Sequence, residues 1–217
     1  MRIKVVIFDV DGVLFNTDEI YFTYLQKALQ EIGVKINKKF YALHGYDDCI
    51  YSLSISRKVI AAVKEKMRES YYGDGMIAHV RMNNGILPIL KSLSRVMRLA
   101  TGSGEEKSQI ERYLNYFSLS RFFTFIGHGR LVPGRKGNPE YFYAIADYYR
   151  VKPNECLHVG DTLTDQYALQ AGVSVAIVPT QYSKYLSFDP RCHMLESIES
   201  LPLLLKHEFA TSIVATA

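Results

Sequence analysis

Short apolar runs, each ending at a polar or turn-forming residue, constrain the fold of this chain more than any other feature of its sequence. The runs span residues 5–8, 96–100, 122–126, 156–159 and 173–178. Runs of this kind are typical of strands buried on both faces of a parallel sheet. Stretches with helical character lie between them, at residues 105–116, 139–149 and 164–171. Strands that alternate with helices predict an α/β fold with a doubly wound, mostly parallel sheet.

The stretch from residue 16 to residue 81 interrupts this alternation, because it contains no strand-like run. Apolar side chains recur at helical spacing over residues 19–32 and 56–72. We therefore predict a small helical domain at residues 16–81, inserted into a core domain made of residues 1–15 and 82–217.

Composition excludes several classes of protein. The 26 Lys and Arg against 22 Asp and Glu give a formal net charge of +4, which requires no nucleic acid partner and suits an anionic small molecule. Cys49, Cys156 and Cys192 form no C-x-x-C pair, so neither a disulfide framework nor a structural zinc site is expected. No apolar run approaches the roughly 18 residues of a membrane span. We predict a cytoplasmic monomer or homodimer that binds neither membranes nor nucleic acids.

Two carboxylates, Asp9 and Asp11, follow the first predicted strand, with Gly12 directly after them. Buried carboxylates at a strand end are costly unless a cation or a reaction uses them. One such group can attack a phosphoryl group, and a second can transfer a proton to the leaving oxygen. The alternative interpretation is a solvated turn, and this short motif alone does not decide between the two.

Two further acids, Asp161 and Asp165, follow the predicted strand at residues 156–159. Carboxylate oxygens suit Mg²⁺, which binds through one or two carboxylates together with a substrate phosphate. The alternative makes Asp161 a helix N-cap and Asp165 an acid in the first helical turn. Both interpretations can hold at once.

A hydroxyl and a lysine complete the set. Thr101 and Gly102 lie between a predicted strand and a predicted helix, where a hydroxyl and backbone N–H groups can hold a phosphate oxygen. Lys136 precedes the helix that begins near Pro139, and a lysine can neutralise a phosphate and a carboxylate together. Taken singly, the first pair is more often an N-cap and the lysine a solvated surface charge.

Together and in this order, these motifs resemble those of the haloacid dehalogenase superfamily, in its phosphoglycolate phosphatase-like and β-phosphoglucomutase-like branch. The similarity lies in four segments: residues 8–14, 101–102, 136 and 160–165. Residues 136–142 and 165–172 are similar to two further runs of this branch, with Gly137 where proline is usual. The resemblance covers the core from end to end and is weaker in the inserted helices.

The resemblance implies a role for each matched acid. Asp9 would be the nucleophile and a metal ligand, and Asp11 would be the general acid/base, with its backbone carbonyl on the metal. Asp161 would bind Mg²⁺ directly, whereas Asp165 would support the metal through water or a hydrogen bond. The dehalogenases of this superfamily lack a carboxylate where Asp11 stands, so Asp11 favours phosphoester chemistry.

Thr101, the backbone amide of Gly102 and Lys136 would hold the transferring phosphoryl group. The inserted helices would act as a cap over the substrate. The candidates for cap contacts with the substrate are His44, Tyr46 and Arg57. The alternative is that these three are polar residues on the surface of the cap.

The predicted function is that of a Mg²⁺-dependent phosphatase acting on a small phosphorylated metabolite, such as a phosphoglycolate-like compound or a sugar phosphate. One alternative is a phosphotransferase of the β-phosphoglucomutase type, which would use the same core residues. A second alternative is a phospho-accepting signalling or binding protein without turnover.

Overall fold

The computed structural model describes residues 2–72, 74–133 and 135–209, apart from the side chains of residues 46, 47, 70–72, 74 and 75. Its centre is a six-stranded parallel sheet with the order β3-β2-β1-β4-β5-β6. From β1 the chain winds outward to β3 and then returns to the other side of β1 with β4, so the sheet is doubly wound. The strands are β1 (Val5–Phe8), β2 (Arg98–Gly102), β3 (Phe125–Gly127), β4 (Cys156–Gly160), β5 (Ser174–Ile177) and β6 (His193–Met194). The predicted fold class is confirmed.

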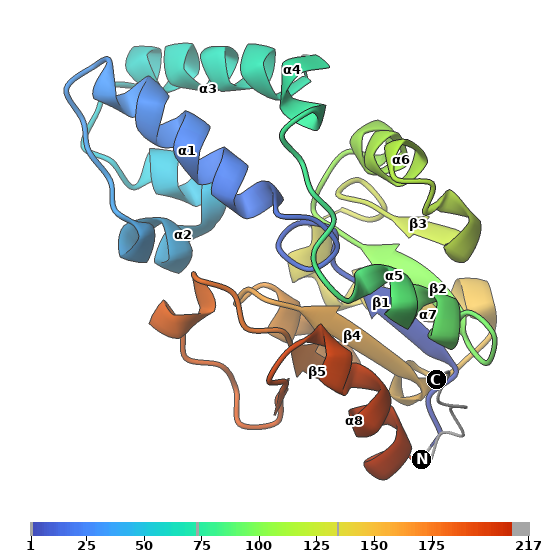
Figure 1. The fold of residues 1–217 in the computed structure, drawn as a ribbon. Helices are drawn as coiled ribbons and strands as arrows, with labels where there is room; N and C mark the ends of the chain where they lie inside the picture. Colours follow the sequence, from blue (N-terminus) through green and yellow to red (C-terminus); the bar gives the residue numbers. More distant parts are fainter. Residues whose placement is uncertain (1, 73, 134, 210–217) are drawn as a thin grey trace.

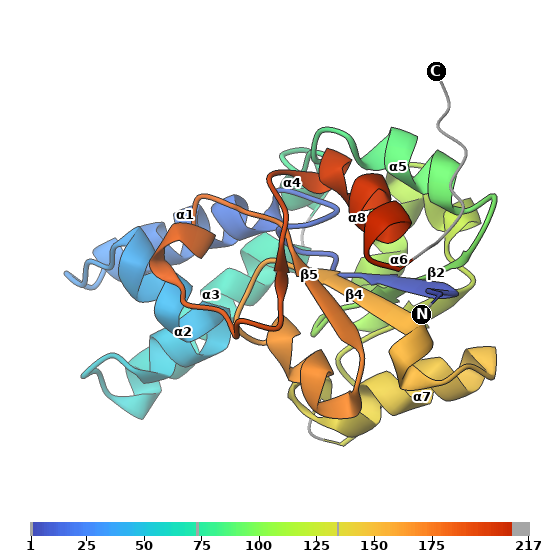
Figure 2. The same ribbon diagram turned by 90° about the horizontal axis from the view of Figure 1, so that it is seen from below.

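Helices cover both faces of the sheet (Figure 1, Figure 2). One face carries α5 (Ile86–Leu93), α6 (Lys107–Tyr116) and α8 (Leu201–His207). The other carries α7 (Pro139–Tyr149) and the 3-10 segment Asp165–Ala171. The side chains of β1 alternate between two hydrophobic clusters, one on each face. Because both faces of the central strands are covered, β1 is apolar throughout and does not alternate with polar residues.

The predicted strands differ from the observed ones mainly at their ends. β2 includes Thr101 and Gly102, which the sequence placed after the strand. β3 begins at Phe125 rather than at residue 122, because the chain first makes a 3-10 turn at Ser120–Phe122. β6 has only two residues, too few to produce a recognisable pattern.

Among the helices, α6 and α7 lie where they were predicted, whereas the predicted helix at residues 164–171 is a 3-10 segment. Its turns close by short-range bonds, such as that from the Gly172 N–H to the Leu169 carbonyl at 3.1 Å. Gly172 adopts the left-handed conformation and ends the segment directly. Such tight turns are common in short connecting segments.

The inserted part consists of α1 (Thr17–Gln30), α2 (Lys38–Tyr51), α3 (Arg57–Tyr72) and α4 (Asp74–Ile77). These helices form a group beside the carboxyl ends of the strands (Figure 1). The chain enters and leaves the group through two adjacent segments. Phe15 forms an antiparallel bridge with Met82, and the Asn16 side chain accepts from the Arg81 N–H at 2.6 Å. The division into residues 1–15 with 82–217 and residues 16–81 stays a prediction.

Gly102 shows how closely the central strands pack. A Cβ at this position would lie 2.6 Å from Ile7 Cγ2 and 3.3 Å from His158 Cε1. We expect Gly102→Ala to lower the free energy of unfolding by about 1–3 kcal/mol, because overpacking a filled core forces its neighbours to move. Urea denaturation measures this effect. The matched control is Gly104→Ala, whose added methyl group meets no atom within 4 Å. Equal loss of stability in the two variants would contradict this account of the packing.

Candidate active site

Asp9 and Lys136 form a buried ion pair at the carboxyl end of β1. Asp9 directly follows the strand, and its N–H donates to the Val159 carbonyl at 2.8 Å. Lys136 Nζ donates to Asp9 Oδ2 at 2.6 Å, and the Val10 N–H donates to Oδ1 at 2.7 Å. Burial raises the pKa of Asp9 to about 8, although Lys136 acts in the opposite direction. Lys136 alone therefore does not fully ionise Asp9 at neutral pH, and further positive charge would be needed for that.

Asp165 is the most heavily hydrogen-bonded of the acids. Its Oδ1 accepts from Lys136 Nζ at 2.5 Å and from His158 Nε2 at 2.6 Å. Its Oδ2 accepts from the N–H groups of Asp161 and Thr162 and from the Thr162 hydroxyl, at 3.0, 2.8 and 2.7 Å. Burial opposes ionisation, but Lys136 and His158 outweigh it and hold the pKa of Asp165 well below its ordinary value. Asp165 is therefore ionised and anchors the lysine.

Asp161 has the opposite surroundings. Both of its carboxylate oxygens are buried, and among the described residues no N–H group, hydroxyl or basic side chain donates to them; their polar neighbour is another acid, Asp18. Gly12, with φ 73°, passes so close that a Cβ there would collide with the carboxylates of Asp161 and Asp18. Burial, and then the charges of Asp18 and Asp165, raise the pKa of Asp161 well above its ordinary value. Buried acceptors without a donor cost free energy, and a bound cation would remove that cost.

The acids at this point fit a divalent metal ion. Ligand oxygens of Asp9, Asp161 and Asp165 lie within 4.8 Å of one another. Asp165 already accepts five hydrogen bonds, whereas Asp9 accepts one on each oxygen. Asp161, followed by Asp9, therefore has the most lone pairs available for direct coordination. A cation that takes one or two carboxylates and a phosphate oxygen matches this donor set.

Asp11 lies beside this cluster and makes different contacts. The Thr17 hydroxyl donates to Asp11 Oδ1 at 2.5 Å, and the Ser103 hydroxyl lies 3.5 Å from Oδ2. Burial, then Glu105 and Asp9, raise the pKa of Asp11 well above its ordinary value. A carboxyl group whose pKa is raised holds its proton more readily and can act as a proton donor.

Thr101 and Gly102 end the strand next to β1. Thr101 pairs in register with Phe8, so it lies close to the start of the segment that carries Asp9. Its side chain is fully buried, and its hydroxyl donates to the Gly127 carbonyl at 3.1 Å. Neither residue lines the cavity described below. Their contact with a phosphoryl group stays a prediction.

Four of the residues predicted from the core motifs, Asp9, Asp11, Lys136 and Asp161, line one cavity of about 850 Å³. The volume lies in the upper part of the range usual for small-molecule sites, roughly 300–1,000 Å³. The structure therefore gathers acids from the ends of β1 and β4 and a lysine from the segment before α7 around a single space.

The opposite wall of this cavity comes mainly from α2. His44 lines it, and its Nδ1 donates to the Phe40 carbonyl at 2.9 Å, because a carbonyl can only accept. Gly45, with φ 71° and ψ −178°, kinks α2 next to it in a conformation almost restricted to glycine. Of the other cap candidates, Arg57 is exposed and does not line the cavity, and the Tyr46 side chain lies outside the described residues.

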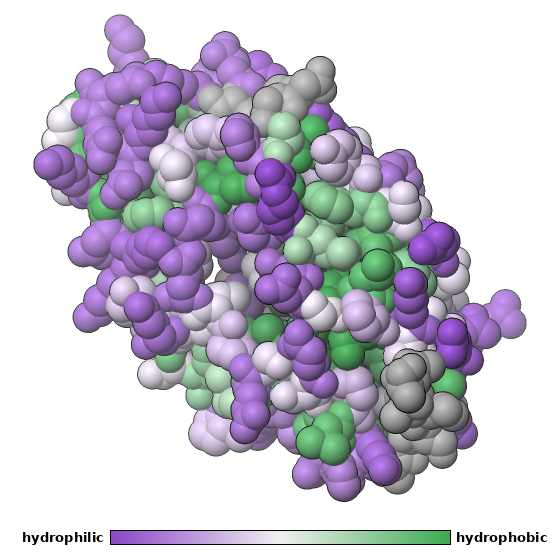
Figure 3. Space-filling view, viewed as in Figure 1, coloured by the Kyte–Doolittle hydropathy of each residue, from purple (hydrophilic) through white to green (hydrophobic). Residues whose placement is uncertain are grey.

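Side chains of the loop after β5 connect the core to the inserted helices. The Tyr182 hydroxyl donates to Glu19 of α1 at 2.8 Å, and Lys38 of α2 lies 3.2 Å from the same carboxylate. Gln181 hydrogen-bonds to both Glu19 and Lys38. Figure 3 shows the surface hollowed between α1 and this loop, with hydrophilic residues around the hollow. These contacts determine how the inserted helices lie over the ends of the strands.

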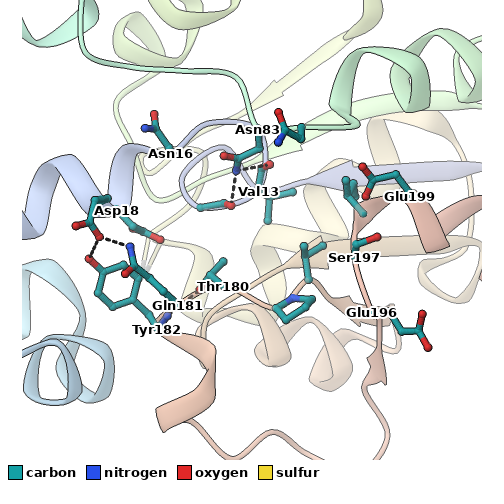
Figure 4. A pocket seen from close by; sticks show the side chains of 16 residues that line it. Val13, Asn16, Asp18, Asn83, Thr180, Gln181, Tyr182, Glu196, Ser197 and Glu199 are labelled. Carbon is teal, nitrogen blue, oxygen red and sulfur yellow. Dashed lines mark hydrogen bonds between the residues drawn. The ribbon is translucent and has the colours of Figure 1, made fainter.

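A second cavity of about 400 Å³ lies on the other side of the turn between β1 and α1 (Figure 4). Asn83 Nδ2 crosses this turn and donates to the carbonyls of Gly12 and Val13 at 2.7 and 3.0 Å. Asp18 lines both cavities, and burial raises its pKa to about 6. The hydrogen bonds from Asn83 thus stabilise the turn that places Gly12 beside Asp161.

Sequence reasoning missed Asp18, Thr17 and Ser103 as parts of this site. Asp18 is in the first turn of α1, where an acid is usual for reasons of helix electrostatics alone. The hydroxyls of Thr17 and Ser103 reach Asp11 only through the fold, which brings the start of α1 and the end of β2 together. Nothing in the sequence pattern indicates that either hydroxyl would lie beside Asp11.

Comparisons with known proteins agree with this geometry. A family model described as haloacid dehalogenase-like hydrolase matches residues 6–178. The N-acylneuraminate-9-phosphatase of Rattus norvegicus is 26% identical to this chain, over 94% of each chain. The phosphoglycolate phosphatase of Aquifex aeolicus is 23% identical, over 94% of this chain and 98% of its own. The structure of CbbY from Rhodobacter sphaeroides in complex with phosphate superposes with a TM-score of 0.74 at 19% identity, over 92% and 96% of the two chains.

The match over most of the chain shows that the protein belongs to the haloacid dehalogenase-like hydrolase family. The resemblance noted from the motifs is thereby confirmed, and so is the prediction of an enzyme of this superfamily. Among the described residues, no helix is long and apolar enough to cross a membrane.

The raised pKa values predict that a divalent cation stabilises this protein more at higher pH. The folded-state pKa of Asp9 is about 8 and that of Asp18 about 6, both above the unfolded value, so the stability from their protonated forms is present at low pH. That stability is lost progressively as pH rises from the ordinary Asp value of 3.8 to the folded-state values of about 6 and 8. A cation binds the ionised carboxylates and restores it.

The increase in melting temperature caused by Mg²⁺ should therefore be larger at pH 8 than at pH 6. Scanning calorimetry with and without Mg²⁺ at each pH measures it, and contributions from histidines elsewhere cancel in the difference. Asp161→Asn should remove most of the increase. An increase that is equal at both pH values, or one that survives in this variant, contradicts the assignment of the cation site.

Proposed function

We propose that this protein is a Mg²⁺-dependent phosphatase that hydrolyses a small phosphomonoester through an aspartyl-phosphate. The observation that carries the proposal is the pairing of Asp9 with Lys136 beside Asp161, whose buried oxygens lack any donor. Phosphoryl transfer needs in-line positioning and neutralisation of charge more than covalent assistance. A lysine, a carboxylate nucleophile and a cation site around one cavity supply these requirements.

In the first step, a carboxylate oxygen of Asp9 attacks phosphorus and the bond from phosphorus to the leaving oxygen breaks. Asp11 gives its proton to that oxygen, which suits the raised pKa of this group. Lys136 holds the nucleophile and takes up negative charge on the phosphoryl oxygens.

In the second step, Asp11, now ionised, takes a proton from a water molecule. The water oxygen attacks phosphorus, the bond to Asp9 breaks, and phosphate is released. Thr17 keeps Asp11 oriented through both steps by its hydrogen bond to Oδ1. Because Thr17 is the first residue of α1, this orientation depends on the position of the inserted helices.

Asp9 and Asp161 would hold Mg²⁺, and Asp165 would support the site without direct coordination. When bound, the cation supplies charge that lowers the cost of ionising Asp9 and of gathering phosphoryl oxygens beside carboxylates. Thr101 and the Gly102 amide are proposed to contact the phosphoryl group from the end of β2.

The inserted helices are proposed to act as a cap, and the wall of α2 to receive the leaving group. The Nδ1 atom of His44 is hydrogen-bonded to the Phe40 carbonyl of the same helix. Its Nε2 atom is therefore left for a hydroxyl or an anionic group of the substrate. The size of the cavity accommodates a sugar phosphate as well as a phosphoglycolate-like compound. All three cysteines are free and buried, in keeping with the predicted cytoplasmic setting.

The mutase alternative uses the same core and differs in what happens to the phosphoryl group after transfer. The cavity is large enough for an intermediate to remain bound, which is the observation in its favour. Analysis of the products with a sugar phosphate separates the two, since a phosphatase releases inorganic phosphate and a mutase returns an isomer. A phospho-accepting signalling protein would instead keep its phosphoryl group without turnover.

The proposal predicts that the protein hydrolyses an aryl phosphate with Mg²⁺ and loses this activity with a chelator. Asp9→Asn should reduce kcat by at least about 10⁴-fold while the protein stays folded, because the amide is a poor nucleophile. The matched control is Asp147→Asn, the same change at an exposed position on α7. Full activity in Asp9→Asn would rule out the nucleophile.

The role of Asp11 predicts a dependence on the leaving group. Asp11→Asn should reduce kcat/KM, which covers the reaction up to departure of the first leaving group, by roughly 10²–10⁴-fold with an alkyl phosphate, whose leaving oxygen needs a proton. With nitrophenyl phosphate, whose leaving group is stable as an anion, the reduction should be smaller. Steady-state kinetics on both substrates measures the ratio, and an identical reduction on the two would contradict the acid role.

A further inference from the structure

His158 is a polar residue in the most deeply buried part of the sheet. It occupies the middle of β4, all of whose residues are buried, and its own side chain is fully inaccessible. A buried imidazole is costly unless its nitrogens are hydrogen-bonded. The partner of its Nε2 nitrogen, the Asp165 carboxylate, gives His158 a specific role.

The ring is held tightly in one orientation. Nε2 lies 2.6 Å from Asp165 Oδ1, Nδ1 lies 3.1 Å from the Ile7 carbonyl, and the Phe142 ring packs edge-on at 5.1 Å. The missing side chain of Gly102 leaves the space that the ring fills. The Ile7 carbonyl and the ionised Asp165 can both only accept, so a neutral ring donates to one of them. The shorter contact, 2.6 Å to a charged oxygen, places the proton on Nε2.

Lys136 uses the same carboxylate oxygen as His158. Its Nζ lies 2.5 Å from Asp165 Oδ1 and 2.6 Å from Asp9 Oδ2, so the ammonium group is shared between two carboxylates. The other oxygen of Asp165 accepts three further hydrogen bonds from its own loop, and none of those donors contacts Oδ1. His158 and Lys136 therefore share the negative charge of one oxygen.

We propose that His158 is a positioning residue that, by donating to Asp165 Oδ1, limits the pull of Asp165 on Lys136 and keeps the lysine against Asp9 and the phosphoryl group. Without this donor, Asp165 Oδ1 has Lys136 as its only partner among the described side chains. The ammonium group then moves toward Asp165 and away from Asp9 Oδ2. This inference rests on the proposed phosphatase function.

The experiment compares His158→Met, which fills the space without a donor, with His158→Gln, whose amide can donate where Nε2 does. Both are assayed with an aryl phosphate and Mg²⁺, and their affinity for inorganic phosphate is measured by titration calorimetry. The Met variant should lose about 10- to 100-fold in kcat and bind phosphate more weakly, as is typical when the partner of a site ligand is removed. The Gln variant should recover most of both quantities.

The structural control is Tyr149→Phe, which removes a buried hydrogen bond to the Leu99 carbonyl in the same sheet. It should lower the melting temperature and leave kcat and phosphate affinity unchanged. If the Met variant does not fold, His158→Asn replaces it, because the shorter amide does not reach Asp165.

Several results would overturn the inference: parental kcat and phosphate affinity in His158→Met, or equal losses in the Met and Gln variants. Absence of turnover in the unmodified protein would instead refute the proposed function. The two failures are therefore distinguishable.

Discussion

The crowding of buried carboxylates around a single buried lysine is the constraint on which the rest of the structure depends. Asp9, Asp161 and Asp165 bring oxygens within 4.8 Å of one another, and Lys136 bridges two of them. Burial raises the pKa values of Asp9 and Asp161, whereas at Asp165 the lysine and His158 outweigh burial and lower the pKa. A divalent ion and a phosphate supply the charge and the ligands that this arrangement lacks.

The sheet produces this crowding through its topology. The strand order reverses beside β1, and crevices at such a reversal, outside the carboxyl ends of the strands, are where α/β sheets bind ligands. Phe8 pairs in register with Thr101 on one side and Val159 on the other, so the residues that follow these strands emerge together. Gly12 then lets the backbone pass beside Asp161 without a collision. Helices placed over these ends enclose the cavity and strengthen the electrostatic contacts inside it.

The sequence allowed the α/β fold and the family to be predicted, because apolar runs and motif order are local properties of the chain. It also indicated the carboxylates that line the cavity. The contacts of Thr17 with Asp11 and of His158 with Asp165 span only six and seven residues. They could not be predicted, because they depend on the exact path of the turns between those residues. α2 was missed because the kink at Gly45 breaks its helical periodicity. β6 was missed because two residues at a sheet edge leave no pattern.

The most direct test of the central claim is to identify the atom that receives the phosphoryl group. The protein is mixed with a ³²P-labelled phosphomonoester and Mg²⁺ and quenched in acid within a single turnover, and the labelled peptide is sequenced by mass spectrometry. The account predicts an acyl phosphate, labile to base, on the carboxylate of Asp9. A phosphoryl group on any other residue, or turnover that leaves no label on the protein at any time, would contradict it.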